Sequence, residues 1–272
     1  MKTIVLATDF SDNAERAARF ALQMAQAHNA QLVLVNAYQL FPENPIKAGD
    51  FPLSITEARE ESLRALKKLG EKLRTPENAH IHIRAIAKEG GTREAILAVA
   101  HDEKADLLVL STVGTAPQSA QVMGSVATDM VGETDVPLLL IPPSAQYGGI
   151  DNVALAIDLA GTTNAIALDA ALRFARTFGA VVNILCVNDK PDDEETKKRA
   201  EHIRRLTAGQ PHTLTIESAE NVYEAILSFA RAQKADLIMM LPQEHSWFAR
   251  LLGAGETQRV ARLTDIPLLA VV

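Results

Sequence analysis

The chain repeats itself, and this repeat constrains its fold more than any other feature of the sequence. The run Glu-Ala-Ile-Leu at residues 94–97 returns at residues 224–227, 130 positions later. Two further segments return at the same offset: residues 104–108 at 234–238, and residues 134–139 at 264–269. Self-similarity at a fixed offset is typical of a repeated structural unit. We therefore expect two copies of one domain along the chain.

The two copies differ in length near their middle. At the start, Asp9 after the apolar run 4–7 corresponds to Asp158 after the run 153–157, an offset of 149. The second copy therefore lacks about 20 residues, which fall on the proline-containing stretch 39–56 of the first copy. This stretch is predicted to be a long loop, and such loops are usually functional or disordered. Two prolines and two glycines in residues 142–149 mark the boundary, which predicts domains over residues 1–145 and 150–272.

Within each copy, apolar β-branched runs alternate with helical patterns. In the first copy we expect strands at residues 4–8, 32–35, 81–87, 106–110 and 136–141, and helices at 12–29, 56–74, 92–103 and 125–132. Continuous apolar strands separated by helices are typical of a parallel sheet that is covered on both faces. The sequence therefore predicts an α/β fold with two repeated five-stranded parallel-sheet domains.

Composition excludes several classes of function. The chain has 27 Lys and Arg against 34 Asp and Glu, without a basic block, so nucleic acid is not an expected partner. A single cysteine, Cys186, excludes an intramolecular disulfide and any multi-thiolate metal site. The N-terminal apolar run is shorter than a signal peptide needs, and charged residues interrupt every longer run. We expect a soluble cytoplasmic protein without a membrane partner.

The residues that directly follow the predicted strands are the candidate site, because open parallel sheets bind ligands at the carboxyl ends of their strands. In the first copy these residues are Thr8, Asp9, Asn36, Ala37 and the segment 111–114. This last segment opens a loop that ends at Gly124 and Ser125, where a helix is expected to begin. Glycines let the backbone approach an anion, and a helix N-terminus offers free N–H groups. The loop is therefore suited to hold a phosphate group.

This order of features resembles the universal stress protein family, and the repeat extends the resemblance over nearly the whole chain. The nucleotide-binding branch of that family carries the signature Gly-x2-Gly-x9-Gly-Ser/Thr, binds ATP, and has an aspartate after the first strand. Gly114, Gly124, Ser125 and Asp9 match this pattern, whereas Ser111 replaces the first glycine. The resemblance implies a tandem protein with the universal stress protein fold, which is adenine-nucleotide hydrolase-like.

The resemblance also implies the ligand and its contacts. The implied ligand is ATP or a related adenine nucleotide, with Mg²⁺ as a candidate accompanying ion. Ala37 and Leu110 fall where family members line the adenine pocket, while Thr8, Thr112 and Val126 flank the matched positions and could add backbone contacts. No residue is assigned as a metal ligand.

The second copy departs from the signature. At the offset of 130, the four motif positions Ser111, Gly114, Gly124 and Ser125 become Leu241, Glu244, Ala254 and Gly255. A carboxylate at position 244 would repel a phosphate. Asp158 remains, but an aspartate after a strand can simply cap the next helix. We expect no ATP in this copy, whose pocket could be empty, take another small molecule, or serve as scaffold.

Other conspicuous residues have simpler interpretations. His80 and His82 are expected on one solvated face of an edge strand, because no third metal ligand lies nearby in the sequence. Cys186 is expected to be an inert packing residue. Trp247 and Phe248 could plug the degenerate pocket or contact a partner.

Enzyme motifs are largely missing, and no general base is evident beside the predicted phosphates, so no catalytic residue is assigned. The sequence favours a stress-response regulator in which bound nucleotide orders residues 111–125 and changes a surface read by another protein. Two alternatives stay open: a slow ATPase or nucleotide-dependent enzyme, and a scaffold that binds no nucleotide. The resemblance further implies that the fifth strands, residues 136–141 and 266–271, pair as an intramolecular pseudo-dimer, with a homodimer of chains also open.

Overall fold

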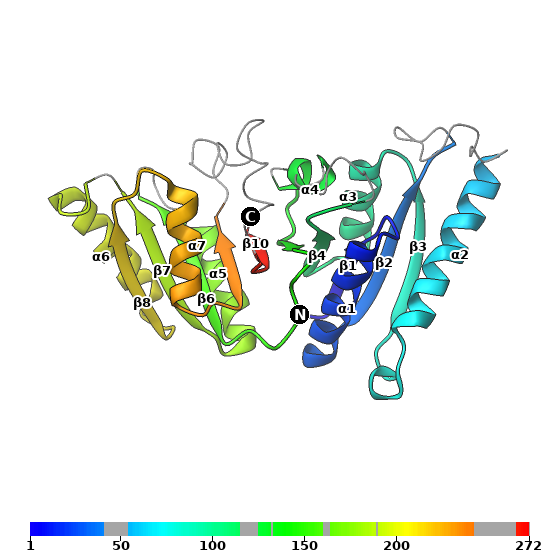
Figure 1. Ribbon diagram of the computed structural model, residues 1–272, viewed down its shortest axis with the longest axis horizontal. Coiled ribbons are helices and arrows are strands. Elements are labelled where there is room, and N and C mark those ends of the chain that lie inside the picture. Colours follow the sequence, from blue (N-terminus) through cyan, green and yellow to red (C-terminus); the bar gives the residue numbers. More distant parts are fainter. Residues whose placement is uncertain are drawn as a thin grey trace. The chain divides into compact units, whose positions relative to one another are not determined.

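The computed structural model describes residues 1–40, 54–114, 125–131, 133–159, 164–188, 190–241 and 265–271 (Figure 1). The chain forms two compact units and passes from the first to the second between Pro143 and Ser144. Each unit has its own parallel sheet and its own helices, which confirms the predicted α/β fold.

The first unit has five parallel strands in the order β3-β2-β1-β4-β5. The strands are β1 (Thr3–Ala7), β2 (Gln31–Tyr38), β3 (Ile83–Glu89), β4 (Leu107–Ser111) and β5 (Leu138–Ile141). The helices are α1 (Asp12–His28), α2 (Ile55–Leu73), the 3₁₀ turn η1 (Pro76–Asn78), α3 (Thr92–Asp102) and α4 (Ser125–Met130). The strand order places β1 at the centre of the sheet.

The second unit repeats this topology, with its strands in the order β10-β9-β6-β7-β8. The strands are β6 (Asn152–Asp158), β7 (Val181–Val187), β8 (His212–Glu217), β9 (Leu237–Met240) and β10 (Leu268–Ala270). The described helices are α5 (Ala165–Phe178), α6 (Glu194–Thr207) and α7 (Val222–Ala232). Strand β6 takes the central position that β1 has in the first unit.

The central strands are buried on both sides, as continuous apolar runs in a covered sheet should be. Ile4, Val5 and Leu6 of β1 have no exposed surface. Helix α1 packs beside them through a face of small side chains that includes Ala14, Ala17, Ala18, Ala21 and Ala25. Ser11 caps the start of this helix by accepting a hydrogen bond from the Ala14 N–H.

The repeated Lys-Ala-Asp segment has the same structure in both units. The Asp106 carboxylate accepts hydrogen bonds from the backbone N–H groups of Lys2 and Thr3, at 2.5 and 2.9 Å. Asp236 accepts from Asp151 and Asn152 in the second unit, both at 2.9 Å. The segment therefore ties the start of the central strand to the turn before its neighbour, which gives a structural reason for its repetition.

Some element boundaries differ from the sequence-based expectation. Strand β2 runs to Tyr38 instead of ending at Val35, and β3 begins at Ile83 instead of Ile81. His80 and His82 therefore precede β3 and do not share a face within it, although both are exposed as expected. No helix in the described part of the chain is both long and apolar enough to span a membrane.

Several predictions fall outside the described residues. They concern most of the loop 39–56, the motif residue Gly124, and the second-unit residues Glu244, Trp247, Phe248, Ala254 and Gly255.

Candidate functional site

The predicted site residues of the first unit gather at the carboxyl edge of its sheet. Strand β1 lies between β2 and β4, with Ala7 opposite Val35 and Leu6 opposite Val109. This register brings the residues that follow β1 level with the ends of the two flanking strands. Seven of the predicted site residues lie at or just beyond the ends of β1, β2 and β4: Thr8, Asp9, Ala37, Leu110, Ser111, Thr112 and Gly114.

Asp9 and Gly114 approach each other closely across this edge. A β carbon added to Gly114 would lie 2.8 Å from Oδ2 of Asp9, closer than real β carbons come to another heavy atom. A side chain at residue 114 would therefore require the Asp9 carboxylate to move. The Asp9 side chain is exposed, and its Oδ1 accepts a hydrogen bond from the Ser11 N–H at 3.1 Å.

The end of β1 is held in place by side chains from two other elements. Asn36 of β2 donates through Nδ2 to the Thr8 carbonyl at 2.8 Å, and its Oδ1 accepts a hydrogen bond from the Ser62 hydroxyl at 2.7 Å. Ser62 lies on α2, so a helix and two strands fix one backbone position beside Asp9. Sequence spacing gave no indication of Ser62, because 26 residues separate it from Asn36.

The residues after β4 use most of their hydrogen-bonding groups within the fold. The Ser111 hydroxyl donates to the Val113 carbonyl at 3.1 Å, and the Thr112 N–H donates to the Ile141 carbonyl of β5 at 3.0 Å. Thr112 and Leu110 are 3% and 6% exposed. Their side chains have little surface for a ligand, so any contribution from Thr112 would come from its backbone.

The predicted phosphate half of the site is only partly described. Ser125 is the first residue of α4, as the sequence predicted, and Val126 after it is half-buried. Gly124 and the side chain of Ser125 lie outside the described residues. Ala37 lies on β2, on the other side of β1 from the loop after β4, and is also half-buried.

The equivalent edge of the second unit has different chemistry. Asp158 ends β6, but Leu241 follows β9 as a buried apolar residue. Cys186 occupies the place that Asn36 has in the first unit, and burial raises the pKa of its thiol to about 12. This side chain packs in the core and stays protonated at neutral pH.

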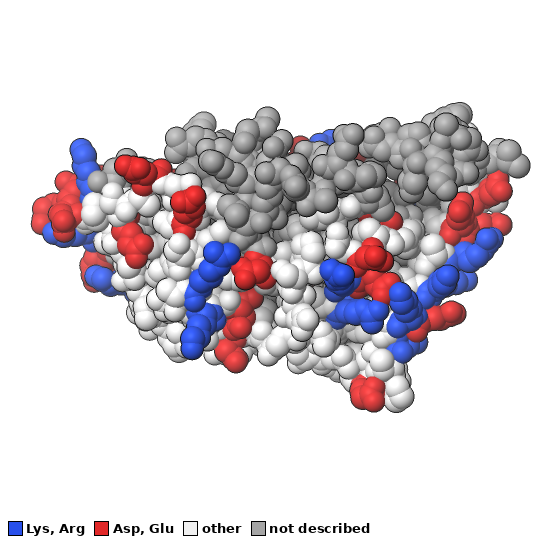
Figure 2. All heavy atoms as spheres, in the orientation of Figure 1, with Lys and Arg blue, Asp and Glu red and all other residues white. Residues whose placement is uncertain are grey.

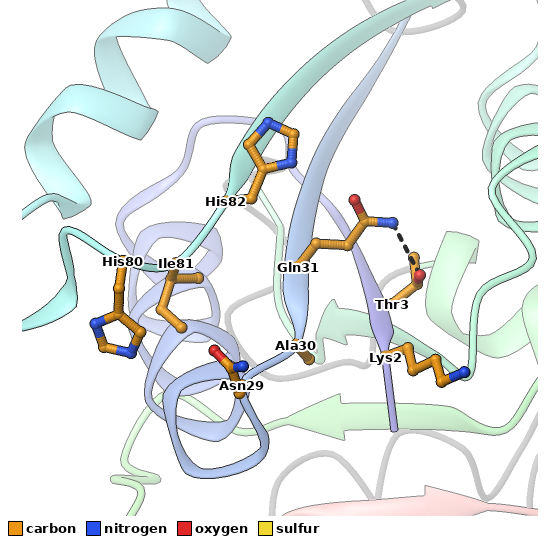
Figure 3. A pocket seen from close by; sticks show the side chains of 8 residues that line it. All are labelled: Lys2, Thr3, Asn29, Ala30, Gln31, His80, Ile81 and His82. Carbon is orange, nitrogen blue, oxygen red and sulfur yellow. Dashed lines mark hydrogen bonds between the residues drawn. The ribbon is translucent and has the colours of Figure 1, made fainter.

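A surface hollow of about 480 Å³ lies at the other edge of the first sheet, where the strands begin (Figure 3). Its lining comprises Lys2, Thr3, Asn29, Ala30, Gln31, His80, Ile81 and His82. Gln31 uses its Nε2 to donate to the Thr3 hydroxyl at 2.9 Å. Figure 3 shows the two histidines pointing away from each other. Among the described residues no group of three or more His, Cys, Asp or Glu could hold a metal ion.

The charged side chains on the face seen in Figure 2 are of mixed sign. Acidic and basic groups lie interspersed across it. The described residues also form exposed ion pairs, such as Arg93 with Glu133 at 3.3 Å. The described part of this face therefore carries no basic stripe of the kind that binds nucleic acid.

Comparisons with known proteins agree with this architecture. A sequence model described as the universal stress protein family matches residues 1–142 and 149–272. A universal stress protein of Thermus aquaticus is 38% identical over 143 residues, which cover 52% of this chain and 98% of that relative. Another from Methanocaldococcus jannaschii is 30% identical over 141 residues, or 52% of this chain and 81% of the relative.

The fold is also similar to solved structures over its full length. The crystal structure of a universal stress protein from Archaeoglobus fulgidus DSM 4304 superimposes with a TM-score of 0.70 at 17% identity. The match covers 99% of this chain and 95% of that one. A tandem arrangement of two such units therefore exists in a solved protein of similar length.

Proposed function

The chain belongs to the universal stress protein family, and on that basis we propose that its first unit binds ATP or a related adenine nucleotide and acts as a nucleotide-dependent switch. The nucleotide would bind at the carboxyl edge of the sheet, around Asp9. The second unit would bind no ATP and would serve as scaffold or take another ligand.

The close approach of Gly114 to Asp9 is the observation that carries this proposal. The added β carbon would be 2.8 Å from the carboxylate, so glycine lets the loop backbone lie directly against an exposed acid. A carboxylate accepts hydrogen bonds from hydroxyl groups such as those of a ribose. A glycine loop beside it lets backbone N–H groups approach phosphate oxygens. The residues present therefore fit a nucleoside phosphate.

Each site residue has a proposed role. Asp9 would accept hydrogen bonds from the ribose hydroxyls. Ala37 would contact the base, together with the 6% of the Leu110 surface that is not buried. Backbone groups of Thr8, Thr112 and Val126 would add contacts. The remaining motif residues, Ser111, Gly114, Gly124 and Ser125, would surround the phosphates, with Mg²⁺ as a candidate counter-ion.

The proposed switch is the loop from Ser111 to Ser125. Bound phosphate would order this loop and so change the surface that a partner protein reads. No catalytic residue is assigned, and hydrolysis is expected to be slow at most.

Isothermal titration calorimetry of the whole chain with ATP tests the proposal. We expect one ATP per chain for the natural protein and at least tenfold weaker binding for Gly114→Ala, since the new methyl must displace the Asp9 carboxylate. The matched control is Gly209→Ala in the second unit, where an added β carbon meets no atom within 4 Å. That variant should bind ATP like the natural chain.

Three other outcomes would redirect the assignment. Absence of binding to the natural chain would favour a scaffold. Unchanged affinity in Gly114→Ala would place the nucleotide elsewhere. Measurable turnover that Asp9→Ala abolishes would favour an enzyme over a switch.

A further inference from the structure

The turn after β1 contains a strained aromatic residue beside the proposed site. Phe10 has a φ of 62°, in the left-handed region that a bulky side chain rarely adopts. Its side chain is 40% exposed, so burial alone does not account for its conformation. A residue in such a conformation persists only when the surrounding structure determines it.

Hydrogen bonds on both sides of Phe10 hold its backbone in this conformation. The Phe10 N–H donates to the Thr8 hydroxyl at 3.0 Å, which closes the turn from the strand side. The Ser11 N–H donates to Asp9 Oδ1 at 3.1 Å, and Ser11 itself caps α1. Asp9 therefore lies inside a short closed turn, with its Oδ2 directed at Gly114.

The second unit provides an internal comparison, because the same fold there lacks this turn. At the offset of 149, Thr8 and Phe10 correspond to Ile157 and Leu159. Ile157 has no hydroxyl to close a turn, and Leu159 is 1% exposed with φ outside the left-handed region. Its carbonyl instead accepts from Nη1 of Arg199 at 2.6 Å.

The other left-handed residues behave differently, since they occur in both units. Asn29 at the end of α1 has its counterpart in Gly179, and Lys104 before β4 in Lys234. Among the described non-glycine residues, only the Phe10 conformation lacks a left-handed counterpart in the other unit. The fold requires a left-handed residue at the positions that both units share, but it does not require one at position 10. The strain is confined to the copy that keeps the glycine motif.

We infer that Phe10 is a positioning residue: its left-handed turn, closed by the Thr8 hydroxyl, holds the Asp9 carboxylate in the orientation that binds the nucleotide. This inference rests on the proposed function and adds the device that orients its acid. Phe10 and the Thr8 hydroxyl act through Asp9 and need not touch the ligand.

A Thr8 variant series tests whether the turn acts through Asp9. Thr8→Val keeps the shape of the side chain but removes the acceptor, and we expect ATP affinity to fall roughly three- to tenfold. Thr8→Ser, which restores the oxygen, should recover most of this loss. In an Asp9→Ala background, Thr8→Val should cause no further loss, because the group it positions is already absent.

The matched control removes another buried threonine hydroxyl. Thr207 in the second unit has no exposed surface and donates to the Ile203 carbonyl at 3.0 Å. Thr207→Val should affect thermal stability without changing ATP affinity, which separates a loss of positioning from a general loss of stability.

Two further variants test the backbone conformation without any ligand. Phe10→Gly and Phe10→Ala remove nearly the same contacts, but only glycine adopts a φ of 62° without strain. Phe10→Gly should therefore melt a few degrees above Phe10→Ala, the reverse of their usual order.

The outcomes separate failure of this inference from failure of the proposed function. If the natural chain binds ATP and Thr8→Val binds equally well, or if its loss persists in Asp9→Ala, the positioning role is wrong and the nucleotide site stands. If Phe10→Ala melts at a higher temperature than Phe10→Gly, the inference that residue 10 is held in a strained conformation is wrong. If the natural chain binds no ATP, both proposals are overturned.

Discussion

At the scale of single residues, the two repeated aspartates make identical contacts in the two units. Asp106 and Asp236 each accept hydrogen bonds from two consecutive backbone N–H groups at the start of the central strand. Loss of one carboxylate leaves both donors to water and removes a tie between residues more than 80 positions apart. A backbone anchor of this kind is needed for stability and does not require a ligand.

We expect Asp106→Ala to lower the free energy of unfolding by about 1 kcal/mol, the usual net value of a hydrogen bond that is partly exposed. Asp236→Ala should cost a similar amount in its own unit. Urea unfolding followed by circular dichroism measures both changes. Asp102→Ala is the control, because its exposed pair with Lys88 spans 3.4 Å and should contribute less than about 0.5 kcal/mol. An equal loss in the control would contradict the anchor role.

Cys186 provides a second prediction at this scale. Burial raises the pKa of its thiol to about 12, and the thiolate is the reactive form. Ellman's reagent should therefore leave the folded protein unmodified at pH 8 and titrate one thiol per chain after denaturation. Rapid labelling of the folded protein would show that β7 opens readily.

The sequence predicted where the residues of the candidate site lie in the fold, but not how they are held. Thr8, Asp9, Ser111 and Gly114 could be located because they lie at or shortly after the end of an apolar strand, and the ends of parallel strands meet at one edge. Phe10 could not be identified as strained, since no residue pattern specifies a left-handed aromatic. A threonine two residues before it is the weak signal that the sequence offered.

At the scale of elements, an ion pair connects α1 to α2. Glu15 of α1 contacts Lys72 of α2 with Nζ to Oε2 at 2.5 Å, and it also pairs with Arg19 one turn along its own helix. The hydrogen bond from Lys72 is the largest influence on the Glu15 carboxyl group and holds its pKa below the ordinary value of 4.5, against the opposing effect of burial. The unfolded chain lacks this partner, so the carboxylate stabilises the fold only where it is ionised.

The pH dependence of stability follows from the direction in which folding shifts the Glu15 pKa. Because folding lowers the pKa of Glu15, its contribution is complete above about pH 4.5 and is lost as the pH falls through the folded value. A double-mutant cycle with Glu15→Gln and Lys72→Met should give a coupling of at most about 1 kcal/mol at pH 7, since the lysine is 57% exposed. The coupling should shrink as the pH falls below 4.5 and passes through the lowered pKa of Glu15. A coupling that does not change as the pH is lowered would indicate packing instead of charge.

Element boundaries show where sequence patterns were sufficient. Helix α1 begins at Asp12 as predicted, because Ser11 is a strong cap and the alanine face is periodic. The start of β3 at Ile83 was missed because His80 and His82 alternate with Ile81 as in a strand, although Ile81 is buried before the ladder begins. Periodicity identifies the buried positions, whereas the ladder hydrogen bonds depend on the neighbouring strand.

At the scale of the whole molecule, the internal repeat carried most of the information about architecture. Matching blocks at one offset implied equal topology, and both units have their strands in equivalent order. The repeat could not predict function equally well for both, because the motif residues differ between the copies while the buried pattern is retained. The packing of one unit against the other stays a prediction.

That prediction can be tested through the fifth strands. In the first unit Leu108 and Thr112 donate to the carbonyls of Pro137 and Ile141, so the odd-numbered residues of β5 face β4 and the N–H groups of Leu138 and Leu140 point away. In the second unit the N–H groups of Leu268 and Ala270 likewise point away from β9, since Ile238 donates to the Pro267 carbonyl and the Val271 N–H donates to the Met240 carbonyl. If the two strands pair, these four outward amides should exchange with deuterium as slowly as those of the central strands. Light scattering should give 29.4 kDa if the pairing is within one chain. Fast exchange at all four amides would contradict the intramolecular pseudo-dimer. Slow exchange together with a measured mass of twice 29.4 kDa would show instead that the strands pair between two chains.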